Sequence, residues 1–324
     1  MSTVPSLFYA DRSERGRLRL TGRDRQSFLQ GMVSNDVGSL QPGQGVYTFL
    51  LDATGHVIAD ARVLCTPEYL LLDVEPGMVP TVTQQLERHL VMERVRITDI
   101  SGEMGQLLVA GNDTPTFLAK LTTELSPNAT EGANAFVPTN RDGEGYIVAA
   151  ARLLPVPAFD VYGSTDALAN FRARLEEANA ASASPELLDT LRIEAGVPRF
   201  GSDMDARVLA PETSQQKRAI HYRKGCYIGQ EIVARIDARG HTNRTLVGFV
   251  LPANAPIPPA EVPVVVDGGT VGRVTSAALS PHLARPIALG YLRHEYANPG
   301  TPVKIGDDTA TVVTLPFDLS GQAG

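Results

Sequence analysis

The first part of the chain alternates between strand-like and helix-like patterns of hydrophobic residues. Residues 15–22 alternate charged and apolar side chains, which predicts a strand. The next segment places Phe28, Leu29 and Met32 at helical spacing. A hairpin is predicted after it, because two apolar runs are joined by Ala-Thr-Gly. The elements expected up to residue 101 are strands at 47–52, 56–65, 69–75 and 95–101, and a helix carrying Val82, Leu86 and Leu90.

The pattern then repeats in part. Strands are expected at 105–111, 146–154 and 159–164, and helices at 114–125 and 165–180. Two rounds of strands followed by a helix predict two related α+β lobes packed on antiparallel sheets.

Two helices in this region carry capping signals. Thr165 is the expected N-cap of the first. The second has Ser184 as its cap and Pro185 in its first turn, and Gly196 marks its end.

From about residue 245 the sequence predicts short, closely spaced strands that are separated by Gly and Pro. Such a pattern is typical of a small β-barrel or sandwich. These strands are expected at 245–251, 262–268, 270–279, 286–292, 301–305 and 309–315. We therefore expect an α+β region at 1–243, with two pseudo-repeated lobes that divide near residue 104, and a C-terminal barrel at 244–324.

Composition narrows the class of protein. The formal charge of −7 argues against a general binder of nucleic acids or anionic membranes. The N-terminus has no signal-peptide pattern, and no apolar run is long enough to cross a membrane. The two cysteines, Cys65 and Cys226, form neither a metal motif nor a disulfide framework. We expect a soluble, cytoplasmic protein without a metal site.

One segment opposes the overall negative charge. Residues 217–244 include seven basic residues but only two acidic ones, Glu231 and Asp237. The basic residues are Lys217, Arg218, Arg223, Lys224, Arg235, Arg239 and Arg244. A local concentration of cations on an acidic protein suits the capture of a small anionic ligand. A solvated basic loop without a ligand is the alternative.

Cys226 lies inside this segment, in KGCYIGQE at residues 224–231. Nearby cations lower the pKa of a thiol by favouring the thiolate. Gly225 and Gly229 flank it, and a helix is expected to begin after Gly229. A buried structural thiol is the expectation for Cys65 in its strand, whereas this polar, glycine-rich setting favours an exposed Cys226.

These motifs together resemble a known family. LRIEAGVPRFGSDMD at 191–205 and KGCYIGQEIVARIDARGH at 224–241 are similar to the YgfZ family of folate-binding proteins, which is related to the glycine cleavage T-protein, an aminomethyltransferase. The segments at 20–45 and 268–293 resemble the N-terminal part and the C-terminal barrel of these proteins. The resemblance covers residues 16 to 317.

The resemblance implies two ferredoxin-like α+β lobes and an antiparallel β-barrel around a central channel for tetrahydrofolate or a one-carbon derivative of it. Glu194 matches the position that holds the pterin in T-proteins. Arg223 and Lys224 are the expected contacts for the folate carboxylates. Tyr47 matches an aromatic position that contacts folate.

Two positions bear on catalysis. T-proteins have a glycine turn that leads to paired aspartates, and this chain keeps the second acid as Asp60 but has Ala59 in place of the first. T-proteins usually lack a thiol at the position of Cys226. YgfZ-like proteins are associated with the assembly or repair of iron–sulfur clusters, for which a soft thiolate is suited.

Three hypotheses follow from the sequence. The leading one is a tetrahydrofolate-binding accessory protein for iron–sulfur cluster assembly or repair, with Cys226 as its working thiol and iron–sulfur proteins or assembly factors as partners. The alternative is a folate-dependent aminomethyltransferase that uses Asp60. The third is a folate-binding protein without chemistry of its own.

Overall fold

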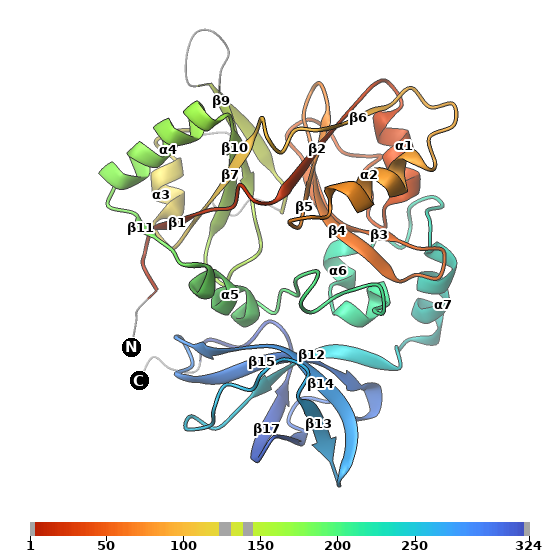
Figure 1. Ribbon diagram of the computed structural model, residues 1–324, viewed down its shortest axis with the longest axis vertical. Coiled ribbons are helices and arrows are strands. Elements are labelled where there is room, and N and C mark those ends of the chain that lie inside the picture. The colour runs from red at the N-terminus through yellow and green to blue at the C-terminus, as the bar shows by residue number, and fades with distance from the viewer. Residues whose placement is uncertain (1–3, 123–130, 139–144, 321–324) are drawn as a thin grey trace.

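The computed structural model describes residues 4–122, 131–138 and 145–320. Two α+β lobes lie side by side, and a closed β-barrel packs below both of them (Figure 1). The predicted α+β class with a C-terminal antiparallel barrel is confirmed.

The first lobe is a five-stranded antiparallel sheet covered by two helices. Its strands, in the order β3-β4-β5-β2-β6, are β3 (Gly45–Leu51), β4 (Val57–Cys65), β5 (Leu70–Val74), β2 (Gly16–Thr21) and β6 (Arg96–Asp99). The helices are α1 (Arg25–Met32) and α2 (Val79–Glu87). Phe28, Leu29 and Met32 of α1 are buried in the same core as Val82 and Leu86 of α2, as their helical spacing predicts.

The second lobe is a six-stranded sheet with two helices. Its strands, in the order β11-β1-β7-β10-β9-β8, are β11 (Ala181–Ser182), β1 (Phe8–Asp11), β7 (Gly105–Ala110), β10 (Ala158–Gly163), β9 (Gly145–Ala150) and β8 (Asn134–Pro138). The helices are α3 (Thr114–Leu118) and α4 (Thr165–Glu177). The helix expected at 114–125 ends early at Leu118, and its last part reaches residues outside those described.

The chain begins in the second lobe and then crosses to the first. β1 pairs antiparallel with β7 and parallel with β11, whereas the next strand, β2, pairs with β5 and β6. Figure 1 shows β1 and β2 following one another from one lobe to the other. The sequence pattern did not predict β1, which is only four residues long. The first lobe is therefore enclosed in sequence between strands of the second.

The predicted cap of α4 is wrong by one residue. Ser164, and not Thr165, has an extended backbone and accepts a hydrogen bond from the amide of Ala167 over 3.3 Å. Thr165 is already the first residue of the helix, so it cannot be the N-cap, which precedes the helix. Ser184 caps α5 (Pro185–Glu194) as predicted, through the amide of Leu187.

Six strands close into the C-terminal barrel. Their order is β12 (Arg244–Val250), β15 (Arg285–Arg293), β14 (Gly269–Ser280), β13 (Pro263–Val266), β16 (Pro302–Ile305) and β17 (Asp308–Val313). Its interior is a cluster of aliphatic residues around Phe249. The closed ladder leaves no free edge strand, which explains how such short strands form a stable unit.

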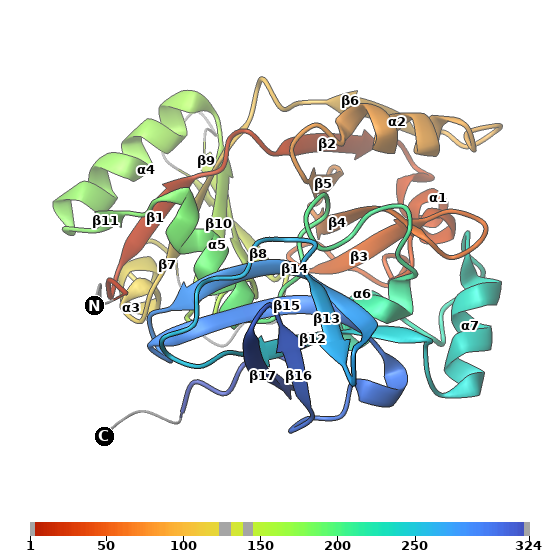
Figure 2. The same ribbon diagram turned by 60° about the horizontal axis from the view of Figure 1, so that its bottom comes forward.

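The regular elements of the segment between the lobes and the barrel are short helices. It contains α5, the 3₁₀ turn η1 (Ala210–Thr213), α6 (Gln216–Ala219) and α7 (Gln230–Arg239). Figure 2, in which the barrel is turned toward the viewer, shows α7 at one side of the first lobe and β12 leading from it into the barrel. This segment carries most of the sequence motifs singled out above, and it contacts all three parts of the molecule.

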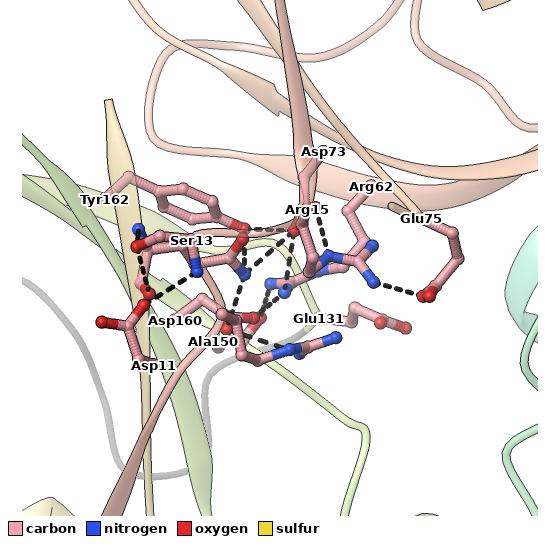
Figure 3. Close-up of polar contacts among 12 residues, drawn as sticks. Asp11, Ser13, Arg15, Arg62, Asp73, Glu75, Glu131, Ala150, Asp160 and Tyr162 are labelled. Carbon is pink, nitrogen blue, oxygen red and sulfur yellow. Dashed lines mark hydrogen bonds and ion pairs between the residues drawn. The ribbon is translucent and has the colours of Figure 1, made fainter. Parts of the chain in front are cut away.

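Buried charges join the two lobes (Figure 3). Arg62 on β4 forms an ion pair with Asp160 on β10, and both side chains are almost fully buried. A second carboxylate, Asp73 on β5, accepts hydrogen bonds from Arg15 Nε over 2.5 Å and from the Tyr162 hydroxyl over 2.7 Å. The buried guanidinium groups of Arg62 and Arg15 thus each have a carboxylate beside them, and the one beside Arg62 comes from the other lobe.

Removal of one member of this network should lower the stability of the folded protein. Asp160→Ala leaves the buried guanidinium of Arg62 without its closest carboxylate, so we expect the free energy of unfolding to fall by about 3–5 kcal/mol. Urea unfolding measures the loss. Arg172→Ala is a matched control, because its ion pair with Asp11 is solvent-exposed and is expected to contribute about 1 kcal/mol or less. Equal losses in the two variants would contradict a structural role for the buried pair.

Candidate functional site

Two residues that the sequence assigns to the site, Tyr47 and Asp60, lie in contact. They project from the neighbouring strands β3 and β4, where Tyr47 pairs opposite Arg62. The hydroxyl of Tyr47 donates a hydrogen bond to Oδ2 of Asp60 over 2.8 Å. The other carboxylate oxygen, Oδ1, is buried and has no hydrogen-bond partner among the described residues. Asp60 therefore presents one unused acceptor inside the protein.

The surroundings of Asp60 change its acidity. Burial raises the pKa of Asp60 to about 6, and the carboxylate of Glu75 contributes to the rise. Burial also raises the pKa of Tyr47 well above its usual value, so the phenol remains a donor at neutral pH. A carboxyl group that titrates near neutrality can take up and release a proton under physiological conditions, whereas an ordinary aspartate stays ionised.

Arg218 of α6 covers this pair. Its guanidinium carbon lies 4.1 Å from the centre of the Tyr47 ring, and the guanidinium is hydrogen-bonded to both carboxylate oxygens of Glu131. From the sequence, Arg218 was expected only as one of the seven basic residues of the segment 217–244. No sequence signal pointed to Glu131, which lies 87 residues earlier. The ion pair holds Arg218 over the ring that orients Asp60.

A short segment after α1 ties β3 to α6. The amide nitrogen Nδ2 of Asn35 donates to the backbone carbonyls of Tyr47 over 2.8 Å and of Arg218 over 2.9 Å. The hydroxyl of neighbouring Ser34 donates to the carbonyl of Ala219 over 2.7 Å. One side-chain amide therefore fixes the backbone of Tyr47, which orients Asp60, and of Arg218, which covers the Tyr47 ring.

Lys224 binds to the same segment. Its ammonium donates to the backbone carbonyls of Gln30, Val33 and Asn35 over 2.6–2.7 Å. Burial lowers the pKa of Lys224 to about 8. All three ammonium protons have partners within the protein, so the observed role of Lys224 is to hold the KGCYIGQE loop on the first lobe. Its predicted contact with a folate carboxylate stays a prediction.

The thiol of Cys226 is free and exposed, while Cys65 is buried, and both agree with the sequence-based expectation. Arg223 is exposed and has no ion-pair partner in the part of the chain that the structure describes. Both residues belong to the loop between α6 and α7. The structure thus leaves the thiol and this guanidinium accessible from solvent.

Gly229 ends the loop and begins α7, as the sequence suggested. Its φ of +83° is in the left-handed region, and a Cβ there would lie 2.6 Å from the carbonyl oxygen of Asp52. Only glycine therefore allows the loop to approach the turn between β3 and β4 this closely. The turn that precedes Asp60 and the loop that carries Cys226 are in direct contact.

Glu194, at the end of α5, is fully buried against the barrel. Its carboxylate accepts hydrogen bonds from the Ser280 hydroxyl and from Nδ1 of His282, the latter over 2.8 Å. These contacts anchor the β14–β15 connection and lie on a different element from Tyr47 and Asp60. The expected contact of Glu194 with a pterin stays a prediction.

Among the described residues, no three His, Cys, Asp or Glu side chains come together as a metal site. None of the helices in the described ranges combines the length and the apolar character needed to cross a membrane.

The sequence matches two consecutive family domains. Residues 6–224 match the GCVT N-terminal domain, and residues 244–318 match the glycine cleavage T-protein C-terminal barrel domain. The chain belongs to the glycine cleavage T-protein family. The relationship to the T-protein predicted from the motifs is thereby confirmed, while membership of the YgfZ branch stays a prediction.

Individual relatives agree with this family. A protein named aminomethyltransferase from Rubrobacter xylanophilus is 30% identical over 310 residues, which cover 95% of this chain and 82% of the relative. A protein of Arabidopsis thaliana named as a putative chloroplastic transferase is 26% identical and covers 94% of this chain and 69% of its own length. The crystal structure of the glycine cleavage system aminomethyltransferase T from Bartonella henselae has the same fold, with a TM-score of 0.85 at 19% identity, and the match covers 97% of this chain and 87% of that structure.

The raised pKa of Asp60 predicts an unusual effect on stability. The folded-state pKa of about 6 exceeds the unfolded value near 3.9, so the folded protein binds the proton more tightly. Stability is consequently lost as the pH rises from about 4 to 6. Asp60→Asn removes this loss, and we expect the variant to be about 3 kcal/mol more stable than the wild type at pH 7 but not at pH 4.

Denaturant unfolding at the two pH values measures this difference. Asp52→Asn is the matched control, since hydrogen bonds from His56 and Thr54 lower the pKa of Asp52. The same substitution should there reduce stability at pH 7. An Asp60→Asn variant that is less stable than the wild type at pH 7 would contradict the raised pKa of Asp60.

Proposed function

We propose that the protein is a tetrahydrofolate-dependent aminomethyltransferase in which Asp60 exchanges a proton with the reacting groups. The observation that carries this proposal is the state of Asp60, which is buried, oriented by Tyr47 and left with one oxygen that has no partner among the described residues. Relatives that align with 91–95% of the chain are named aminomethyltransferase, which supports the choice of reaction.

An aminomethyl transfer moves a carbon from a thioether sulfur to two nitrogens of the reduced folate, and the two protons that these nitrogens lose equal those gained by the departing ammonia and thiol. A protein group that accepts and returns a proton lowers the barrier of such a step by general acid–base catalysis. Oδ1 of Asp60 is the atom available for this exchange, because Tyr47 occupies Oδ2.

The donor and acceptor properties of the site agree with a reduced folate. Its pterin carries N–H donors, and Oδ1 of Asp60 is a buried acceptor without a donor of its own. Arg223 is exposed beside the loop and can pair with a carboxylate of the glutamate tail. Lys224 and Glu194 are part of the proposed folate site only if ligand binding replaces some of their present contacts.

Two substitutions test the role of Asp60. Asp60→Asn should retain the binding of tetrahydrofolate in calorimetry but release methylenetetrahydrofolate from an aminomethyl-lipoyl carrier about 10²–10⁴-fold more slowly, because an amide exchanges no proton. Tyr47→Phe removes the hydroxyl that favours the ionised carboxyl group, so the midpoint of the pH–rate profile should move to higher pH.

Each part of the proposal can fail separately. If tetrahydrofolate does not bind to the wild-type protein, the folate premise is wrong. If Asp60→Asn transfers the aminomethyl group at the wild-type rate, another residue exchanges the proton.

A second candidate function is suggested by Cys226, the exposed thiol that distinguishes KGCYIGQE from the usual T-protein sequence. In this proposal the protein is a member of the YgfZ branch and supports the assembly or repair of iron–sulfur clusters in a folate-dependent way. A single cysteine cannot hold a cluster, so the thiol would act together with a partner protein that supplies the remaining ligands.

Complementation separates this candidate from the first. In cells that lack the protein, Cys226→Ser should fail to restore the activities of iron–sulfur enzymes, whereas Asp60→Asn should restore them if transfer is not required. Cys226 is exposed, so its replacement should leave the melting temperature of the purified protein unchanged. Full restoration by Cys226→Ser would remove the thiol from the mechanism.

A further inference from the structure

Arginines from distant parts of the chain gather where α7, η1 and the barrel meet. Two adjoining pockets of about 300 and 350 Å³ share Leu209, Glu212 and Asn243 as lining residues. We call them together the arginine groove, after the arginines that line them, which are Arg207, Arg235, Arg239, Arg244 and Arg293. Neither Tyr47 nor Asp60 lines this groove, so it is separate from the site described above.

The positive charge of the groove is only partly neutralised. Arg244 pairs with the buried carboxylate of Glu212 over 3.1 Å, and Arg207 pairs with Asp205 over 2.5 Å. Arg235, Arg239 and Arg293 have no carboxylate within ion-pair distance among the described residues. These three guanidinium groups therefore remain available to an anion.

The fold also places these like charges close together. Arg235 and Arg239 are one turn apart on α7, a spacing at which equal charges repel. Arg293 on β15 lies directly opposite Arg244 on β12, and equal charges in this cross-strand position also oppose the fold. An anion in the groove would relieve both repulsions. The overall charge of the chain is −7, so this positive groove differs from the rest of the protein.

The groove also has apolar lining residues. Leu209, Ile232 and Ile236 line the first pocket together with Arg235 and Arg239. A small inorganic anion would leave this aliphatic surface in water, whereas an organic anion would cover it. Guanidinium groups bind carboxylates and phosphates equally well through paired hydrogen bonds.

We propose that the arginine groove binds an organic anion that has an apolar body and two or more negative charges, carried by carboxylate or phosphate groups. Its apolar body lies on Leu209, Ile232 and Ile236, and its anionic groups pair with Arg235 and Arg239 on one side and with Arg293 on the other. This site is independent of the proposed aminomethyl transfer, because it shares none of the residues assigned to that reaction.

Calorimetry with three probes at low ionic strength tests the proposal. Benzene-1,3,5-tricarboxylate and 1,4-phenylene bisphosphate each combine an apolar ring with two or more anionic groups, and inorganic pyrophosphate has charge alone. We expect at least one of the ring-containing probes to bind more tightly than pyrophosphate, and the preferred one identifies carboxylate or phosphate as the natural group. The proposal is contradicted if none of the probes binds, or if pyrophosphate binds as tightly as both of the others.

Paired variants locate the binding. Arg235→Ala with Arg293→Ala removes one cation from each pocket and should weaken the preferred probe by roughly tenfold or more. Arg88→Ala with Arg152→Ala is the matched control, because both side chains are exposed arginines outside the groove and carry the same change of net charge. Equal weakening in both double variants would show a general charge effect and overturn the assignment. Unchanged affinity in the groove variant would overturn it as well.

Discussion

The buried pairing of charges between the two sheets is the constraint on which the rest of this structure depends. Arg62 and Asp160 come from different lobes, and neither can be buried stably without the other, since an unpaired buried charge costs several kcal/mol. The same strand carries Asp60 two residues before Arg62, so both side chains project from one face of the sheet. Tyr47 lies opposite Arg62 on the next strand. The contact between the lobes therefore also orients the carboxyl group proposed to react.

The acidity of Asp60 follows from the same packing. Asp60 is buried, and among the described residues one side chain, Tyr47, donates a hydrogen bond to its carboxylate, so the charged form is poorly solvated. Asn35 and Lys224 hold the backbone around this pair through amide and ammonium hydrogen bonds to carbonyl groups. The protein thus keeps one strained group within a region whose other polar atoms are mostly satisfied, an arrangement typical of functional sites.

Local patterns predicted the elements but not the contacts between them. The helical spacing of Phe28, Leu29 and Met32 and the alternation in β2 depend on burial of one face, which the sequence shows directly. Tyr47 and Asp60 were each expected at the site from a resemblance, but their contact was not, and it follows from the register of one hairpin. The pair formed by Arg218 and Glu131 joins the second lobe to α6 of the connecting segment, and no periodicity in the chain encodes such a distant partner. Likewise, the basic segment looked like one ligand site, yet the fold distributes its cations among Glu131, backbone carbonyls, Glu212 and the arginine groove.

The position of β1 has a consequence for how the chain assembles. All strands of the first lobe lie within residues 16–99, whereas the second lobe needs β1 from the N-terminus and β11 from residues 181–182. During synthesis the first lobe can complete its sheet while β1 still waits for β7, its antiparallel neighbour. We expect the second lobe to form after the first, because its sheet closes over long sequence separations, which slow folding. The chain is thus one unit inserted into another.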